Sequence, residues 1–157
     1  MPIVSKHSAG LLMYRRTVSG AVEVLLAHPG GPYWTRKDDG AWTLPKGECE
    51  SGEEPLACAC REFEEETGQA PNGPFSPLGE VRQKSGKRVQ AWSFEADMEP
   101  ARLQSNLFEM EWPPGSGQQL QFPEVDRVAW FGLDAARVKL LPAQCALLDR
   151  LEQSLGA

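Results

Sequence analysis

The residues of this chain best suited to chemistry are three glutamates, Glu62, Glu65 and Glu66, at positions i, i+3 and i+4 within residues 47–69. Side chains at these spacings share one face of an α-helix, so a helix here gathers three carboxylates. Magnesium and manganese prefer carboxylate oxygens and keep some of their waters beside a phosphate substrate. The spacing therefore predicts a site for hard divalent cations. A solvated acidic face is the alternative interpretation.

The helix that must carry these glutamates has clear expected ends. Like charges at i and i+4 weaken a helix, so a helix with a purely structural role would gain from a lysine in place of one of them. We expect Gly52 or Glu53 to be the N-cap and Pro55 to lie in the first turn, where its missing N–H is harmless. Gly68 is a natural C-terminal stop. The other face carries the residues expected to pack inward: Leu56, Cys60, Phe63 and Thr67.

The residues around this helix resemble the Nudix hydrolase box, a pattern of glycines, glutamates and one arginine at fixed spacings. The matching positions are, in order, Gly47, Glu53, Arg61-Glu62-Phe63, Glu65-Glu66 and Gly68. The one departure is Gln69, which stands where the family has an aliphatic residue. This departure concerns the packing after the helix and not the metal chemistry.

The resemblance implies both a fold and a set of ligands. The expected fold is a Nudix-type α/β/α sandwich, with a central mixed β-sheet flanked by helices, in a single domain over residues 1–157. In the family, the positions of Glu62, Glu65 and Glu66 supply metal ligands for Mg²⁺ or Mn²⁺, and the carbonyl at Gly47 often adds another.

Two basic residues have expected supporting roles. Arg61 lies four residues before Glu65, so it can orient that carboxylate and lessen the repulsion within the cluster. A simple surface ion pair is the alternative, and in the family the position of Glu53 interacts with this arginine. Lys46 can reach a phosphate, with a solvated lysine as the alternative.

A further glutamate is a candidate ligand or general base. In many Nudix members a glutamate six residues before a tryptophan lies in a loop that faces the metals, and Glu124 and Trp130 have this spacing. We expect Glu124 to act as a ligand or base, with Asp126 and Glu111 as substitutes.

Residues 28–40, HPGGPYWTRKDDG, are expected to form a long loop because they are rich in glycine and proline. Tyr33 and Trp34 offer stacking surfaces for a substrate, and Arg36 offers positive charge. A loop that merely closes the sheet edge is the alternative. His28 is expected to be structural, since no nucleophile is visible beside it.

Apolar periodicity and turn signals give the other elements. Strands are predicted over residues 8–14, 21–27, 41–45, 78–83, 88–94, 106–112 and 124–131, and helices over 133–138 and 143–155. The strand over 88–94 is expected to be central because neither of its faces is cleanly polar. Residues 113–122 are expected to form a loop.

Composition narrows the class of partner. The formal net charge of −6 disfavours loose binding to nucleic acid or to membrane phosphates. No apolar run approaches the roughly 20 residues that span a bilayer, and the N-terminus lacks the apolar segment of a signal peptide. We therefore expect a cytoplasmic protein. The four cysteines lack a C-x-x-C spacing and are expected to be free thiols.

The resemblance implies hydrolysis of a pyrophosphate linkage in a nucleoside-diphosphate-linked small molecule, with water as the nucleophile. Residues 42–47, WTLPKG, resemble members that act on dinucleoside polyphosphates or diphosphoinositol polyphosphates, so long anionic substrates are expected first. A nucleoside triphosphate is the second expectation. A non-catalytic nucleotide-binding regulatory module is the third, although the complete set of box glutamates argues for an enzyme. The oligomeric state stays open.

Overall fold

A six-stranded mixed sheet forms the centre of the molecule in this computed structural model, which describes residues 7–156. The strands are β1 (His7–Arg16), β2 (Val22–Pro29), β3 (Lys46–Glu48), β4 (Ser76–Arg82), β5 (Arg88–Glu95) and β8 (Val125–Gly132). Their order is β4-β5-β1-β2-β8, and β3 pairs with β1. β1 and β5 run parallel, whereas the other neighbours run antiparallel. The central position expected for residues 88–94 is confirmed.

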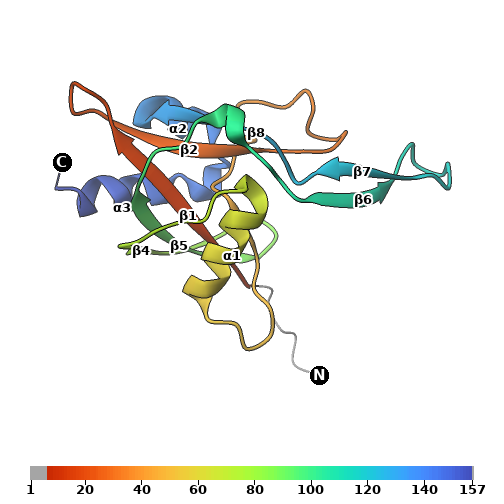
Figure 1. The fold of residues 1–157 in the computed structure, drawn as a ribbon, viewed down its shortest axis with the longest axis horizontal. Helices are drawn as coiled ribbons and strands as arrows, with labels where there is room; N and C mark the ends of the chain where they lie inside the picture. The colour runs from red at the N-terminus through yellow and green to blue at the C-terminus, as the bar shows by residue number, and fades with distance from the viewer. Residues whose placement is uncertain (1–6, 157) are drawn as a thin grey trace.

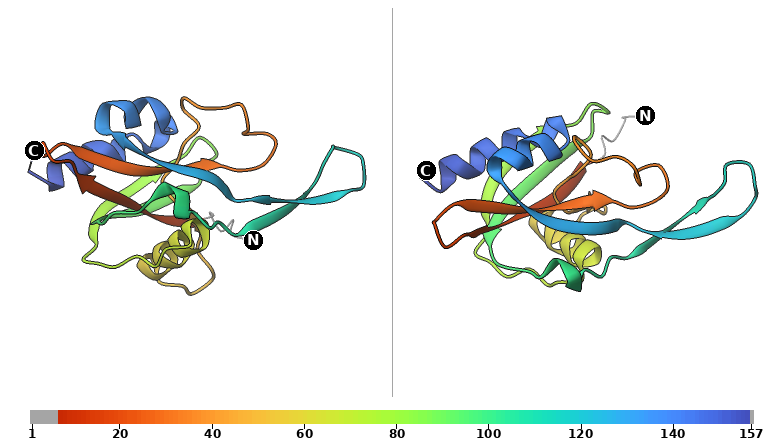
Figure 2. Two further views of the ribbon diagram at one scale, coloured as in Figure 1. Left: turned by 45° about the horizontal axis from the view of Figure 1, so that its top comes forward. Right: turned by 90° about the horizontal axis from the view of Figure 1, so that it is seen from above.

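Helices cover both faces of this sheet (Figures 1 and 2). α1 (Pro55–Thr67) lies on one face, and α2 (Leu133–Lys139) and α3 (Ala146–Ser154) lie on the other. Two short 3-10 helices, η1 (Pro100–Arg102) and η2 (Pro142–Gln144), complete the helical elements. The arrangement is the predicted α/β/α sandwich.

The two layers of core are built by the alternation of side chains along the strands. In β1, Leu12 packs in a cluster with Leu148 of α3, while its neighbour Leu11 packs in a second cluster with Phe63 of α1. All four side chains are almost completely buried. Because Phe63 anchors α1 beneath the sheet, the opposite, acidic side of the helix is left to face the β3 edge.

The ends of α1 agree closely with expectation. The helix begins at Pro55 with Glu54 as its N-cap, one residue beyond the predicted Gly52 or Glu53. Pro55 occupies the first turn, where no N–H is needed. Gly68 adopts a φ of 81° and donates its N–H to the carbonyl of Glu64 at 2.8 Å, which ends the helix as predicted.

Two predictions for secondary structure were wrong. Residues 41–45 make only isolated bridges, Ala27 with Thr43 and Trp42 with Leu140, and the strand β3 comes directly after them. Residues 119–123, expected within a loop, form β7 (Gln119–Pro123), which pairs with β6 (Leu107–Glu111). This two-stranded sheet projects from the body of the molecule (Figure 1). Its residues are mostly exposed, so the chain carries little apolar periodicity to reveal it.

The expectation that all cysteines are free thiols was also wrong. Cys49, just after β3, is joined by a disulfide to Cys58 in α1, with the two Cα atoms 5.4 Å apart. Cys60 and Cys145 are free. The disulfide arises because the loop after β3 turns back onto the helix, an approach that cysteine spacing alone does not reveal.

Within residues 7–156, none of the helices has both the length and the apolar character needed to cross a membrane.

Candidate active site

A cavity of about 410 Å³ lies between the acidic side of α1 and the sheet edge at β3. It brings together every residue that the sequence predicted for metal binding. Glu124, the residue directly before β8, also lines it. Its lining residues are Lys46, Gly47, Glu48, Glu62, Glu65, Glu66, Lys87, Asn106 and Glu124.

Pairing of β3 with β1 presents Lys46 and Gly47 to the helix, in register with Gly10 and Ala9. Gly47 has no room for a side chain, because a Cβ at this position would overlap the carboxylate of Glu62. The glycine therefore allows the backbone of β3 and the acidic side chain to approach each other closely. This contact places the backbone of Gly47 beside Glu62 of α1.

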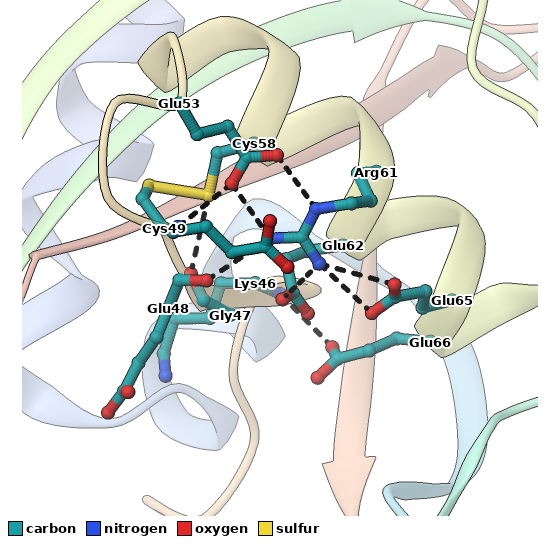
Figure 3. A network of polar contacts seen from close by, with 11 residues as sticks. Lys46, Gly47, Glu48, Cys49, Glu53, Cys58, Arg61, Glu62, Glu65 and Glu66 are labelled. Atoms are coloured by element: carbon teal, nitrogen blue, oxygen red, sulfur yellow. Dashed lines mark hydrogen bonds and ion pairs between the residues drawn. A yellow bond between two sulfur atoms is a disulfide. The ribbon is translucent and has the colours of Figure 1, made fainter.

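Arg61 is the centre of the polar network in this cavity (Figure 3). Its Nε and Nη2 donate to the two oxygens of Glu53 at 2.8 and 2.9 Å. Its Nη1 donates to Glu62 Oε1 at 2.9 Å and to Glu65 Oε1 at 3.2 Å. A further hydrogen bond from Nη2 reaches the carbonyl of Glu48 at 3.2 Å. The expected contacts of Arg61 with Glu53 and Glu65 are both present.

The carboxylates that Arg61 contacts differ in their pKa values. Hydrogen bonds from Arg61 hold the pKa of Glu53 at about 2, and the same bonds raise the pKa of Arg61. Glu62 behaves differently, because burial and then the charge of Glu65 raise its pKa despite the hydrogen bond from Arg61. Glu53 is thus the ionised partner of Arg61, whereas the charge of Glu62 is only partly compensated by the arginine.

Glu66 is the most perturbed carboxyl group of the cavity. Burial raises its pKa to about 8, although a 3.0 Å hydrogen bond from the backbone N–H of Lys46 and the charge of that lysine oppose the shift. Burial also lowers the pKa of Lys46, and Lys87 adds to this effect. The pKa of Glu124 is raised by burial and by Glu65. Several carboxylates here lack sufficient positive charge nearby.

The donor set fits a hard divalent cation. Glutamate oxygens and a backbone carbonyl are the ligands that Mg²⁺ and Mn²⁺ prefer. A cation would compensate the charge of carboxylates whose pKa values are raised by burial first and by neighbouring glutamates second. Among residues 7–156, no three carboxylate, imidazole or thiol groups already converge closely enough to hold an ion. Arg61 engages two of the carboxylates instead.

A second cavity of about 330 Å³ adjoins the first and shares Lys46, Glu66 and Glu124 with it. Its other lining residues are Pro29, Trp34, Thr43, Gln83, Val125 and Leu141. Its wall is therefore more apolar than that of the first cavity. Trp34, which the sequence suggested as a stacking residue, lines this cavity, and Lys37 lies over its ring at 4.9 Å from the centroid.

The other loop residues predicted to bind substrate lie elsewhere. Tyr33 is 57% exposed and packs edge-on against Trp112, with ring centroids 5.3 Å apart. Arg36 is exposed, and neither side chain is among the described residues that line the two cavities.

His28 has the structural role that was expected. It is fully buried, with Nδ1 2.8 Å from Asp126 and Nε2 2.6 Å from the carbonyl of Lys37. Asp126 therefore holds the histidine, and Glu111 accepts from the N–H of Gly115 in the β6–β7 connection. Neither carboxylate is among the described residues that line the two cavities, so Glu124 alone of the three candidates reaches the site.

The lining residues that sequence reasoning missed include three with polar side chains: Lys87, Asn106 and Gln83. Lys87 forms a 3.1 Å ion pair with Glu48 across the mouth of the first cavity. The backbone of Asn106 donates to the carbonyl of Glu65 at 2.8 Å and accepts from the N–H of Glu124 at 2.9 Å. For Lys87 and Gln83, the available signal in the sequence was the turn before β5, which identifies a hairpin but not its proximity to α1.

Comparison with known proteins shows the family of this chain. A family model described as NUDIX domain matches residues 6–150. A search of curated proteins found no match.

Several solved structures share the fold. The Ap4A hydrolase of C. elegans in a binary complex is 21% identical with a TM-score of 0.64, covering 96% of this chain and 98% of that one. The NUDIX domain of Shewanella oneidensis NrtR, complexed with ADP ribose, is 16% identical with a TM-score of 0.67, covering 97% and 89%. The Nudix hydrolase RenU from M. Smegmatis is 24% identical with a TM-score of 0.55, covering 96% and 85%.

Proposed function

This chain belongs to the NUDIX domain family and is a pyrophosphohydrolase acting on acid anhydrides, and we propose that it uses Mg²⁺ or Mn²⁺ to cleave a dinucleoside polyphosphate or a related polyphosphate. The observation that carries the proposal is the union of two cavities of different chemistry. The acidic cavity and the more apolar cavity share Lys46, Glu66 and Glu124. A substrate with a phosphate chain and a base can therefore occupy both at once.

Glu62, Glu65 and Glu66, with the carbonyl of Gly47, are the proposed ligands of the cation. All four residues line the acidic cavity, and the missing side chain at Gly47 lets its backbone approach the carboxylate of Glu62. When bound, a divalent cation supplies charge neutralisation to the phosphate oxygens and lowers the pKa of the attacking water. Arg61 orients Glu62 and Glu65, because one guanidinium nitrogen contacts both.

Glu124 is the proposed general base. A base is most effective when its pKa lies near the operating pH, and burial raises the pKa of Glu124 from its ordinary value. Glu124 lines both cavities, so it borders the place where the phosphate chain of the substrate would join its nucleoside. In the reaction, the water oxygen bonds to phosphorus, the P–O bond of the anhydride breaks, and the proton of the water passes to Glu124. Lys46 stabilises the phosphate chain.

The preference for a substrate with two nucleosides has its own support. A third cavity of about 350 Å³ is lined by Gln83 and Leu141, which also line the second, together with Lys84, Ser85, Pro142 and Ala143. The second and third cavities adjoin each other and offer room for two bases. One protein with this fold is named an Ap4A hydrolase, and another is complexed with ADP ribose, so both names refer to an adenosine linked through a phosphate chain.

The test is a screen of dinucleoside polyphosphates, nucleoside triphosphates and nucleotide sugars with magnesium, with products identified by mass spectrometry. The variant Glu65→Gln keeps the shape of the side chain and removes its charge, so it should fold normally and lose turnover. Equal magnesium-dependent phosphate release by the wild type and this variant would exclude the proposed site.

A further inference from the structure

Gln83 lies in the turn between β4 and β5 and has a side chain that the fold does not use. Its backbone is fully engaged, because its N–H donates to Lys87 at 2.8 Å and its carbonyl accepts from Gly86 at 2.9 Å. Its side-chain Oε1 is buried and has no hydrogen-bond partner among the described residues. A buried acceptor without a donor costs free energy, so an orphaned group of this kind requires an explanation.

The position of Gln83 suggests where the missing donor comes from. The side chain lines the 330 Å³ cavity together with Trp34, next to the acidic cavity. The neighbouring wall residues do not supply the donor. Pro29, Val125 and Leu141 have no side-chain N–H or O–H, and the hydroxyl of Thr43 donates to the carbonyl of Leu44 at 2.9 Å. Trp34 and Lys46 carry N–H groups, but neither donates to Gln83 Oε1.

A ligand in this cavity can supply it. No hydrogen bond from the described residues holds the carboxamide, so it can turn about its last torsion toward a ligand without losing a hydrogen bond to them. Once turned, it presents an acceptor oxygen beside a donor nitrogen. This pair complements an amine beside a ring nitrogen, the arrangement that adenine offers with N6 and N7.

We propose that Gln83 determines base specificity by accepting a hydrogen bond from the amine of an adenine stacked on Trp34. The inference rests on the proposed function, since the base is attached to the phosphate chain that the acidic cavity receives. Trp34 provides affinity for any base through stacking, whereas Gln83 distinguishes bases by their hydrogen-bonding groups.

The experiment compares diadenosine tetraphosphate with the analogue in which both adenines are replaced by unsubstituted purine, which lacks the amine. The wild type should show a kcat/KM about tenfold or more higher for the adenine substrate, as expected for one lost base contact. Gln83→Met should reduce this ratio to near one. Trp34→Ala should lower kcat/KM for both substrates and keep the ratio.

Gln121→Met is the matched control, because it makes the same chemical change at an exposed position of β7. It should leave the ratio of the wild type unchanged. Thermal unfolding provides a second readout: Gln83→Met should unfold at the same or a higher temperature, because it removes an unsatisfied buried acceptor.

The outcomes separate the two proposals. Absence of magnesium-dependent turnover of both substrates by the wild type would overturn the proposed function. Turnover with equal kcat/KM for the two substrates, or a ratio that survives in Gln83→Met, would overturn the role of Gln83 alone. A large fall in the unfolding temperature of Gln83→Met would show that the side chain serves the fold, which also overturns the inference.

Discussion

Arg61 and Glu53 form a two-pronged ion pair, in which Nε and Nη2 of the arginine lie 2.8 and 2.9 Å from the two carboxylate oxygens. Glu53 lies in the loop before α1, whereas Arg61 lies two turns into the helix. Because Glu53 fixes one side of the guanidinium, the remaining nitrogen Nη1 is directed at Glu62 and Glu65. The loop glutamate thus positions two proposed metal ligands that it does not itself touch.

Replacing Glu53 by glutamine should therefore impair catalysis from a distance. The glutamine amide is neutral and has only one acceptor oxygen, so it cannot replace both carboxylate oxygens that accept hydrogen bonds from Arg61. Arg61 then moves more freely and orients Glu62 and Glu65 less well. We expect kcat to fall by about tenfold or more, the range seen when residues supporting metal ligands are changed. Glu54→Gln is the control, because Glu54 is exposed and its side chain makes no capping bond. Equal kcat for both variants would contradict the positioning role.

Glu66 should make the stability of the metal-free protein depend on pH. Its pKa of about 8 in the fold exceeds the ordinary value of 4.5, so the folded state binds more protons than the unfolded state between these values. The contribution of Glu66 to the free energy of unfolding is fully present below pH 4.5 and is lost as the pH rises toward 8. In Glu66→Gln this loss should disappear.

Urea unfolding in EDTA at several pH values between 5 and 8 measures the effect. The free energy of unfolding of the wild type should decline relative to that of Glu66→Gln by at most about 4 kcal/mol. Magnesium should restore the wild type most at the alkaline end, because the cation binds the deprotonated carboxylate. Parallel curves for the two proteins in EDTA would refute the prediction.

The elements that sequence reasoning predicted correctly depend on neighbours in the chain. The acidic side of α1 follows from the spacing of its glutamates, and the end at Gly68 follows from the left-handed conformation that glycine adopts easily. The strands β1 and β2 follow from two apolar runs separated by a short turn. Each of these signals is complete within a few residues.

What the sequence did not reveal depends on segments that meet only in the fold. Asn106 joins the site because its backbone connects the carbonyl of Glu65 to the N–H of Glu124. Trp34 and Tyr33 are adjacent in the same loop, yet only Trp34 lines a cavity, because the loop conformation turns Tyr33 toward Trp112. No local pattern distinguishes these two aromatic residues.

The disulfide between Cys49 and Cys58 belongs to the same class of long-range contact, and its removal should be measurable. The bond closes the loop that carries Glu53, with a sequence separation of 9. The loop entropy restored to the unfolded chain should lower the free energy of unfolding by about 2–3 kcal/mol. Urea unfolding of the wild type with and without a reducing agent measures this difference.

Single-cysteine variants provide the comparison for that measurement. Cys49→Ser should match the reduced wild type and show no further response to the reducing agent. Cys60→Ser should retain the full response, because Cys60 is a free thiol. A wild type whose stability is unaffected by the reducing agent would show that the disulfide does not contribute to the fold in solution.

Gly47→Ala should separate metal binding from folding. A Cβ at Gly47 would overlap the Glu62 carboxylate, so the side chain of Glu62 must leave its position beside the backbone of β3. Glu62 is only partly buried and can move outward at small cost to the core, so stability should change little. The displaced ligand should weaken Mn²⁺ binding by about tenfold or more, by analogy with other changes around metal ligands.

Titration with Mn²⁺ followed by electron paramagnetic resonance measures this affinity directly, without relying on turnover. Gly132→Ala is the matched control, because a Cβ there meets no atom within 4 Å and the backbone is extended. The control should bind Mn²⁺ like the wild type. If Gly47→Ala also retained normal affinity, the cation would not depend on the close approach of β3 to Glu62, and another set of oxygens in the acidic cavity would have to hold it.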